Sequence, residues 1–385
     1  MTALTVQRRS ILAGAPLGGL RVAAFLRRYW HKEPLLVRQA IGGFAGLFER
    51  RDLFALAQRA DVEARLVIRS GTRWSLAHGP FRPVDWKALP ARNWTLLVQG
   101  VNQVSPAADA LLRRFTFLPY ARLDDLMVSY AAPGGGVGAH CDSYDVFLLQ
   151  GFGQRRWRYG RQDNLACKPR LPLKILEQFT PEHSAMLAPG DMLYLPPHIA
   201  HDGVAVEACT TYSIGFRAPS ANELAVAFLD FLSDEIHLPG CYADANLAPV
   251  RAPARIDGAM RERYTRLLDN LAWDKAMVAR FLGCYLSEPK PNIVFDPTQS
   301  PLTRAAFQRR AERNGVGLDL RTQLLYDAAH IFINGLALPW PATERRTLRR
   351  LANTRALGSR FLTGAQPETT ALIYNWYRDG YLHAT

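Results

Sequence analysis

The chain has 385 residues, a formal net charge of +13, 48% apolar residues and 21% charged residues. This length suggests two or three domains, and this composition excludes a chain that is disordered throughout. The five cysteines are widely spaced and include no C-x-x-C pair, which argues against a disulfide framework or a cysteine-based zinc site and favours a reducing compartment, the cytoplasm. No apolar run reaches the roughly 18 residues that span a bilayer, so no membrane association is expected.

The positive charge comes mostly from arginine, with 41 arginines against six lysines. Two interpretations stay open. An arginine-rich surface is typical of proteins that contact an anionic partner such as RNA. A bias of the whole composition toward arginine would carry no information about partners. Twelve arginines lie in the last 85 residues, so the C-terminal region is notably basic.

At the N-terminus, Arg8-Arg9 resembles a twin-arginine export signal. The apolar stretch that follows, Ile11 to Leu20, is short and contains three glycines and a proline, which an export segment should not. The spacing of apolar residues instead predicts an amphipathic helix over Leu20–Tyr29. We therefore expect no export signal here.

The region up to residue 118 mixes helices and strands. Helical periodicity predicts a helix over Arg50–Ala60, and apolar runs predict strands over Ala64–Ser70 and Asn93–Gln99. A further helix is expected over Pro106–Thr116, with Ser105 as its N-cap and the proline in its first turn.

Between Leu123 and Arg217, short β runs alternate with Gly/Pro turns. The predicted strands are Leu126–Ala131, Asp145–Gln150, Arg155–Gly160, Ser184–Leu187, Asp191–Leu195 and Thr210–Phe216. Gly151-Phe152-Gly153 predicts a tight hairpin between two of them. Many short strands at this spacing indicate a β-sandwich or barrel, and hence an α+β chain as a whole.

After Arg217 the pattern becomes helical. Helices are predicted over Asn222–Ile236 and Met260–Leu282, and a Pro-rich linker runs from Lys290 to Pro301. Further along, Arg345-Arg346 and Arg349-Arg350 fall on one predicted helix, and Leu362–Trp376 is interpreted as a small β wing.

The strongest chemical signal is His140-Cys141-Asp142, which follows a glycine-rich turn. Residues two apart on a strand face the same side, so His140 and Asp142 can point into one cavity, with Tyr144 at the next step. Fifty-nine residues after Asp142 comes His201, preceded by the run P-G-D-x-x-Y-x-P-P. That run predicts a turn, a strand and a stop, after which His201 begins the next wall of the barrel.

Two histidines and one carboxylate are typical of non-haem Fe(II) oxygenases, in which three ligands occupy one face of an octahedron and three positions stay open. A structural zinc site would require four ligands and usually thiolates. His198 is an alternative ligand, but it follows the Pro-Pro turn directly and should still lie at the rim. We therefore predict a metal site formed by His140, Asp142 and His201.

An oxygenase of this type also needs a site for the carboxylate of a cosubstrate, and arginine is suited to that task. Strand alternation places Arg155 on one face with two aromatic residues, whereas Arg156 and Arg158 face solvent. The same alternation groups a second set of residues that should line the pocket, namely Asp125, Met127 and Ser129. The alternative for Asp125 is that it caps the preceding turn.

These segments resemble the bacterial ribosomal oxygenases, JmjC-type enzymes that hydroxylate an arginine of large-subunit ribosomal protein sixteen. The resemblance is dense over residues 20 to 220 and looser beyond. It is carried by Tyr29–Ala40, Trp74–Phe81, Pro133–Phe147, Gln150-Gly151, Arg155–Arg158 and Tyr212–Pro219. Cys141 stands where the family often has an apolar residue, and it should face away from the metal.

The resemblance implies roles for nine residues. Three match the iron ligands: His140, Asp142 and His201. Two match residues that hold the 2-oxoglutarate C5 carboxylate: Ser129 and Arg155. Four match the pocket of the substrate arginine: Asp125, Met127, Tyr144 and Ser213. The implied reaction uses Fe(II), 2-oxoglutarate and O2 to hydroxylate the arginine β-carbon, with release of succinate and CO2.

The resemblance also implies an architecture, a double-stranded β-helix (JmjC- or cupin-like) barrel followed by a helical region and a winged-helix-like C-terminal domain. We expect a catalytic domain over residues 1–220, a helical dimerisation region over 221–296 and the winged-helix-like domain over 297–385. The implied partners are a large-subunit ribosomal protein and a second copy of the chain, and the positive charge adds contact with ribosomal RNA as an expectation. Three alternatives stay open: a ribosomal histidine hydroxylase, an arginine demethylase of the same fold, and a non-catalytic ribosome- or RNA-binding protein.

Overall fold

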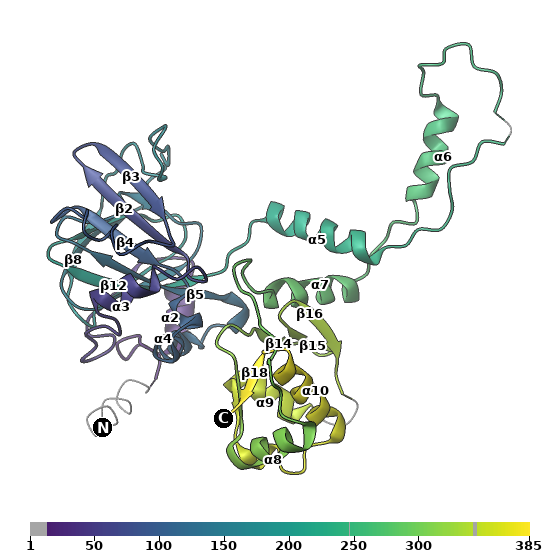
Figure 1. Cartoon of the computed structure of the whole chain (residues 1–385). Helices are drawn as coiled ribbons and strands as arrows, with labels where there is room; N and C mark the ends of the chain where they lie inside the picture. The colour runs from purple at the N-terminus through teal and green to yellow at the C-terminus, as the bar shows by residue number, and fades with distance from the viewer. Residues whose placement is uncertain (1–13, 246, 342–344) are drawn as a thin grey trace.

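The structure is a computed structural model that describes residues 14–245, 247–341 and 345–385. Arg8-Arg9 lies outside these ranges, so the prediction about export stays a prediction. Among the described residues, no helix combines the length and apolar character needed to cross a membrane. Figure 1 shows a β-rich N-terminal part, a helical arm that extends away from it, and a smaller C-terminal part beside the first.

Short helices flank the barrel and confirm the predicted ones, although each is shorter than expected. They are α2 (Val22–Arg28), α3 (Arg50–Leu56) and α4 (Pro106–Leu112), with 3-10 turns at Val101–Gln103, Arg113–Phe115 and Tyr120–Arg122. The hydroxyl of Ser105 accepts a hydrogen bond from the Ala108 amide at 3.4 Å, so the predicted cap fixes the start of α4. Helix α2 buries Phe25 against the barrel, with its ring centroid 5.1 Å from that of Tyr194.

Two antiparallel sheets build the barrel. The larger has the order β1-β10-β7-β12-β5-β4-β2-β3 and the smaller has the order β6-β11-β8-β9. The larger sheet comprises β1 (Leu35–Val37), β2 (Ala64–Ser70), β3 (Arg73–His78), β4 (Trp94–Val98), β5 (Leu123–Ala131), β7 (Val146–Gln150), β10 (Met192–Leu195) and β12 (Cys209–Phe216). The smaller sheet comprises β6 (His140–Cys141), β8 (Arg155–Gly160), β9 (His183–Leu187) and β11 (Ala200–Ala205). From β5 onward the chain passes repeatedly between the two sheets, which is the expected double-stranded β-helix.

The predicted hairpin at Gly151-Phe152-Gly153 is wrong. Strand β7 pairs with β10 and β12, whereas β8 pairs with β9 and β11, so this segment carries the chain from one sheet to the other. Gly153 has a φ of 66°, and a Cβ there would lie 2.2 Å from the carbonyl oxygen of Ala208. The glycine therefore serves a close crossing between sheets, a role that turn residues alone do not distinguish from a hairpin.

The arm consists of α5 (Ala221–Glu235), α6 (Gly258–Leu268) and α7 (Lys275–Ser287). The single helix predicted over Met260–Leu282 is wrong, because the chain breaks between α6 and α7. The side chain of Asp274 accepts a hydrogen bond from the Met277 amide at 2.8 Å and starts a new helix there. An N-capping aspartate accepts hydrogen bonds from the free amides at the start of a helix. This stabilises a new helix start at Asp274, although the spacing of apolar residues continues through the segment.

The C-terminal part holds helices and two three-stranded sheets of order β17-β13-β18 and β14-β15-β16. Its elements are α8 (Arg304–Asn314), β13 (Val316–Leu318), β14 (Leu324–Tyr326), β15 (His330–Ile333), β16 (Leu336–Pro339), α9 (Arg346–Thr354), β17 (Ala356–Leu357), a 3-10 turn (Ser359–Phe361), α10 (Pro367–Arg378) and β18 (Leu382–Ala384). Three of the four predicted helical arginines lie on α9, and Arg345 is its N-cap.

The β wing predicted over Leu362–Trp376 is wrong, because most of that segment is helix α10. Its buried residues Thr369, Ile373 and Trp376 are spaced four and three apart, the period of one helix face. The aromatic and β-branched residues of the segment favour a strand. The buried face of α10 packs against the C-terminal core, and this packing stabilises the helix instead. The two antiparallel sheets of this part are instead built by β14, β15 and β16 and by β13, β17 and β18.

Candidate active site

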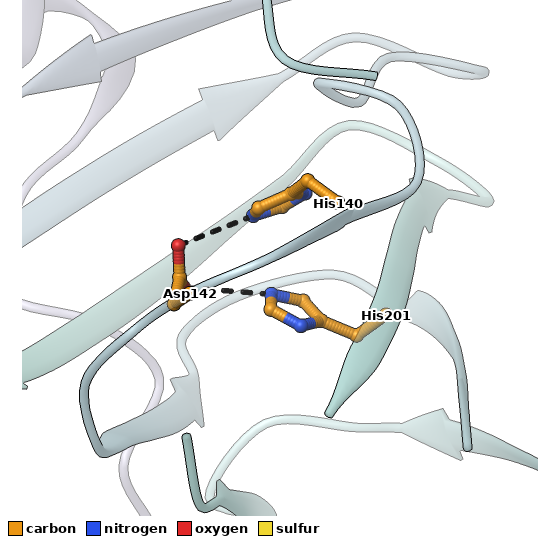
Figure 2. A group of neighbouring side chains, drawn as sticks. All are labelled: His140, Asp142 and His201. Carbon is orange, nitrogen blue, oxygen red and sulfur yellow. Dashed lines mark ion pairs between the residues drawn. The ribbon is translucent and has the colours of Figure 1, made fainter. Parts of the chain in front are cut away.

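Two histidines and an aspartate meet where β6 pairs with β11. His140 on β6 is the register partner of His201 on β11, and Asp142 follows directly after β6. Nε2 of His140 lies 3.9 Å from Oδ1 of Asp142, and Nε2 of His201 lies 3.7 Å from Oδ2 (Figure 2). Strand pairing thus brings together residues that are 61 positions apart, as the sequence predicts.

Backbone carbonyls fix the orientation of both imidazole rings. Nδ1 of His140 lies 2.9 Å from the oxygen of Gly138, and Nδ1 of His201 lies 2.9 Å from the oxygen of Ile199. A carbonyl oxygen only accepts hydrogen bonds, so each Nδ1 carries a proton and each Nε2 is the ring nitrogen that faces Asp142. Burial and the nearby His140 lower the pKa of His201 to about 4, which keeps this ring neutral at neutral pH.

This donor set fits a ferrous ion. Among the described residues, His140, Asp142 and His201 form a group whose donor atoms all lie within 4.8 Å of one another. Two imidazole nitrogens with a single carboxylate are the donor set of non-haem Fe(II) sites, and with three ligands and no thiolate the group does not resemble a structural zinc site. The alternative ligand His198 is exposed, has a φ of 65° and stands before β11, so the structure keeps it at the rim.

A cavity of about 320 Å³ opens on this group. All nine residues singled out in the sequence line it: Asp125, Met127, Ser129, His140, Asp142, Tyr144, Arg155, His201 and Ser213. The predicted alternation of β5 is confirmed, because Leu126, Val128 and Tyr130 pack in the hydrophobic core on the other side of the sheet. The larger sheet therefore separates a packed core from the cavity that holds these polar residues.

Arg155 is the most unusual residue of the cavity. It is 5% exposed, and its Nε and Nη2 have no hydrogen-bond partner in the described structure. Burying unpaired guanidinium donors is costly, so such a group indicates a site shaped for an anion. The hydroxyl of Thr95 is likewise buried without a partner, and that of Ser129 makes only a long contact of 3.5 Å to the Thr211 carbonyl. These donors fit a carboxylate.

The Asp125 carboxylate lies at the other end of the cavity and is 3% exposed. Its Oδ2 accepts hydrogen bonds from the Gly100 amide at 3.1 Å and from Nζ of Lys290 at 3.2 Å. The turn that Asp125 was alternatively expected to cap donates neither of these bonds. Tyr144 stands at the mouth and is 38% exposed.

Several lining residues escaped the sequence reasoning. Thr95, Leu97 and Gln99 line the cavity, while Trp94, Leu96 and Val98 of the same strand belong to the core. The alternation of β4 was a usable signal, but a continuous apolar run hides it. Lys174 comes from the loop between β8 and β9, and no local pattern predicts its position.

Comparison with known proteins gives two family models that match the chain. The JmjC domain matches residues 110–224, and the ROXA-like winged helix matches residues 270–383. A protein of Escherichia coli K12 named "Ribosomal protein uL16 3-hydroxylase" is 36% identical over 280 residues, which cover 72% of this chain and 74% of that protein. The chain belongs to the ribosomal oxygenases.

Two further similarities agree with this family. A Haemophilus influenzae protein named "Probable ribosomal oxygenase" is 33% identical over 393 residues, covering 93% of this chain and 94% of that protein. Two structures of the E. coli ribosomal oxygenase YcfD, described as complexes with cobalt and succinic acid and with cobalt and 2-oxoglutarate, match with a TM-score of 0.80 and 30–31% identity, and each match covers 95% of this chain and 98% of that chain. The expected barrel and C-terminal winged helix are thereby confirmed.

Proposed function

We propose that the chain is an Fe(II)- and 2-oxoglutarate-dependent oxygenase that hydroxylates the β-carbon of an arginine in ribosomal protein uL16. The observation that carries this proposal is the meeting, in one cavity, of the His140–Asp142–His201 group and the buried guanidinium of Arg155, whose Nε and Nη2 have no hydrogen-bond partner. The E. coli relative named as a uL16 3-hydroxylase supports the choice of substrate.

In this proposal the residues that line the cavity have separate binding roles. His140, Asp142 and His201 hold the iron. Arg155 and Ser129 hold the C5 carboxylate of 2-oxoglutarate, which is the carboxylate that does not bind the metal. When bound, iron and 2-oxoglutarate supply the oxidising chemistry that consumes O2 and yields succinate, CO2 and one hydroxyl oxygen. The chain contributes fixed ligands for the metal and a cavity that orients the bound cosubstrate and substrate.

The opposite end of the cavity receives the target side chain. The Asp125 carboxylate pairs with the guanidinium, while Met127 and Tyr144 contact its alkyl portion and Ser213 offers a hydroxyl. Asp124 also lines this cavity and adds a second carboxylate. The Asp125 carboxylate favours a permanently charged arginine over a mostly neutral histidine.

Mass spectrometry tests the proposal directly. The chain is incubated with Fe(II), 2-oxoglutarate, O2 and a uL16 peptide that holds the target arginine, and we expect a product heavier by one oxygen atom. A matched peptide with lysine in place of that arginine should remain unmodified, because it lacks the planar guanidinium. Peptides with methyl-arginine or histidine at the position test the demethylase and histidine-hydroxylase alternatives. Lack of turnover on every arginine peptide, with iron and 2-oxoglutarate bound, would contradict the assignment.

We also propose that the helical arm forms a homodimer interface. Helix α6 has no buried residue, and large apolar side chains are exposed on the arm: Val226, Leu229, Tyr264, Leu268, Leu271 and Trp273. Leu229 and Leu268 are 60% and 61% exposed, which is unfavourable unless another surface covers them. In a homodimer, this apolar surface of each copy would be buried against the same surface of the other copy.

Introducing negative charges on this apolar surface tests the dimer. We expect Leu229→Glu together with Leu268→Glu to convert a dimer into a monomer in sedimentation equilibrium, because each buried glutamate would face an apolar partner. Val84→Glu, at a residue 56% exposed on the barrel, is the matched control and should leave the mass unchanged. A wild-type chain that is monomeric at every concentration would contradict the proposal.

Two further proposals concern the setting of the reaction. Arg304, Arg309, Arg310 and Arg313 are exposed on α8, which supports contact with ribosomal RNA around the substrate protein. The five cysteines are all unpaired, which supports action in the cytoplasm, where ribosomal proteins are assembled.

A further inference from the structure

Lys290 lies in the segment between α7 and α8, yet its ammonium group reaches the barrel. Nζ of Lys290 lies 3.2 Å from Oδ2 of Asp125 and 3.1 Å from Oδ2 of Asp124. The Lys290 side chain is 25% exposed and that of Asp125 is 4% exposed. This largely buried ion pair therefore joins the C-terminal half of the chain to the carboxylate that faces the active-site cavity.

Asp125 separates two hollows, and Lys290 lies on the side away from the iron ligands. Asp125 lines the active-site cavity and also a groove of about 340 Å³ that Lys290 and Asp296 line. Oδ2 is occupied by the Gly100 amide and Lys290. Gly215 lines the active-site cavity, and a Cβ atom added to this glycine would lie 3.8 Å from Oδ1 of Asp125. Oδ2 is thus bonded on the side of the groove, and Oδ1 faces the active-site cavity.

We propose that Lys290 is a positioning residue for the substrate arginine, which binds Oδ2 of Asp125 so that the charged carboxylate presents Oδ1 to the guanidinium. The inference rests on the proposed function for the identity of the cation in the cavity. Lys290 itself does not touch that cation. Its ammonium group compensates the buried carboxylate and sets its orientation, which reduces the reorganisation needed on binding.

The charges around Asp125 support this role. Burial raises the pKa of the Asp125 carboxyl, Lys290 acts in the opposite direction, and the negative charge of Asp124 raises it further. Gln99 donates a side-chain hydrogen bond that favours the charged form, and Tyr144 and Arg65 face the same cavity from the other walls. Among these neighbours, Lys290 is the cation in direct contact with the carboxylate.

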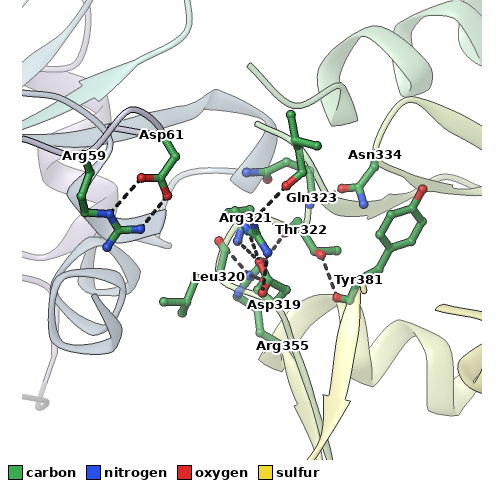
Figure 3. A network of polar contacts seen from close by, with 11 residues as sticks. Arg59, Asp61, Asp319, Leu320, Arg321, Thr322, Gln323, Asn334, Arg355 and Tyr381 are labelled. Atoms are coloured by element: carbon green, nitrogen blue, oxygen red, sulfur yellow. Dashed lines mark hydrogen bonds and ion pairs between the residues drawn. The ribbon is translucent and has the colours of Figure 1, made fainter. Parts of the chain in front are cut away.

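The segment that carries Lys290 is fastened at both ends. Before Lys290, the Arg217 guanidinium donates to the carbonyl oxygens of Leu286 at 3.1 Å and Glu288 at 3.5 Å. After it, Nη1 of Arg321 donates to the carbonyl oxygen of Val294 at 2.9 Å, and the same guanidinium binds Asp319. Figure 3 shows this C-terminal cluster facing Arg59 and Asp61 of the barrel. The docked C-terminal part thereby fixes where Lys290 stands.

The test measures binding of a uL16 arginine peptide to the full chain by calorimetry, from about pH 5 to about pH 8. Lys290→Met should raise the pKa of Asp125. Because the cation binds the carboxylate form, a raised pKa leaves less of Asp125 charged near pH 7, and we expect Kd there to rise on the order of tenfold. The pH below which affinity falls should move upward, and Lys290→Arg should restore the wild-type profile.

Arg321→Gln is the matched control, because it removes the bond to the Val294 carbonyl of the same segment without touching Asp124 or Asp125. A merely structural Lys290 would give both variants the same loss, with no shift of the pH profile, and that result overturns the proposal. Tighter binding by Lys290→Met also overturns it, since Lys290 would then be a competitor of the substrate. A wild-type chain that binds the peptide without hydroxylating it refutes only the proposed reaction, whereas one that binds no arginine peptide refutes both.

Discussion

Replacing His140 with alanine is expected to abolish hydroxylation while leaving the barrel folded. Substitutions that only support a metal ligand already cost about 10- to 100-fold in affinity or activity, so loss of a ligand should cost more than about 100-fold. His140 is half-buried on β6, a two-residue strand at the edge of the smaller sheet. Its removal deletes little packing, and the unfolding temperature of the metal-free protein should change little.

Two measurements check this expectation: calorimetric titration of the variant with Fe(II) under anaerobic conditions, and its thermal unfolding. His198→Ala is the matched control, because this exposed histidine at the rim was the competing ligand. It should bind iron and turn over like the wild type. If His198→Ala loses iron while His140→Ala keeps it, the ligand assignment is wrong.

The site was more predictable from the sequence than the fold around it. Strand alternation is a local property, so the faces of β5 and β8 follow from residue parity alone, and Arg155 and Ser129 both line the cavity as predicted. The short spacing of His140 and Asp142 also constrains them locally. The prediction of His201 as a ligand depended on the P-G-D-x-x-Y-x-P-P run before it, because only strand pairing brings His201 to His140.

Apart from the break before α7, where the capping bond from Asp274 is local, the errors depended on packing that no local pattern encodes. Gly151 and Gly153 signal a reversal of the chain, but which strands then pair is decided by the whole barrel. The break before α7 depends on a capping bond from Asp274, and the helix α10 depends on burial of Trp376 against a core formed by distant segments. Lys290 belongs to the same class, because its linker position says nothing about its contact with Asp125.

Replacing Arg155 with methionine is expected to weaken 2-oxoglutarate binding without destabilising the protein. Loss of a buried, hydrogen-bonded charge partner costs on the order of 3 kcal/mol, so the KM for 2-oxoglutarate should rise about 100-fold. In the free protein the same guanidinium keeps two buried donors unpaired, which opposes folding. An apolar side chain of similar length that packs beside Trp157 removes this cost, so the unfolding temperature without 2-oxoglutarate should stay the same or rise.

The opposite signs of these two effects distinguish an anion site from a structural arginine. Arg155→Lys keeps the charge but loses the planar fork, and it should give an intermediate KM. Arg156→Met is the matched control, because Arg156 is exposed on the other face of β8, and neither KM nor unfolding temperature should change. Steady-state kinetics at saturating iron and calorimetric unfolding without 2-oxoglutarate measure both quantities. A variant Arg155→Met that unfolds more easily and keeps the wild-type KM would show that Arg155 stabilises the barrel instead of binding the cosubstrate.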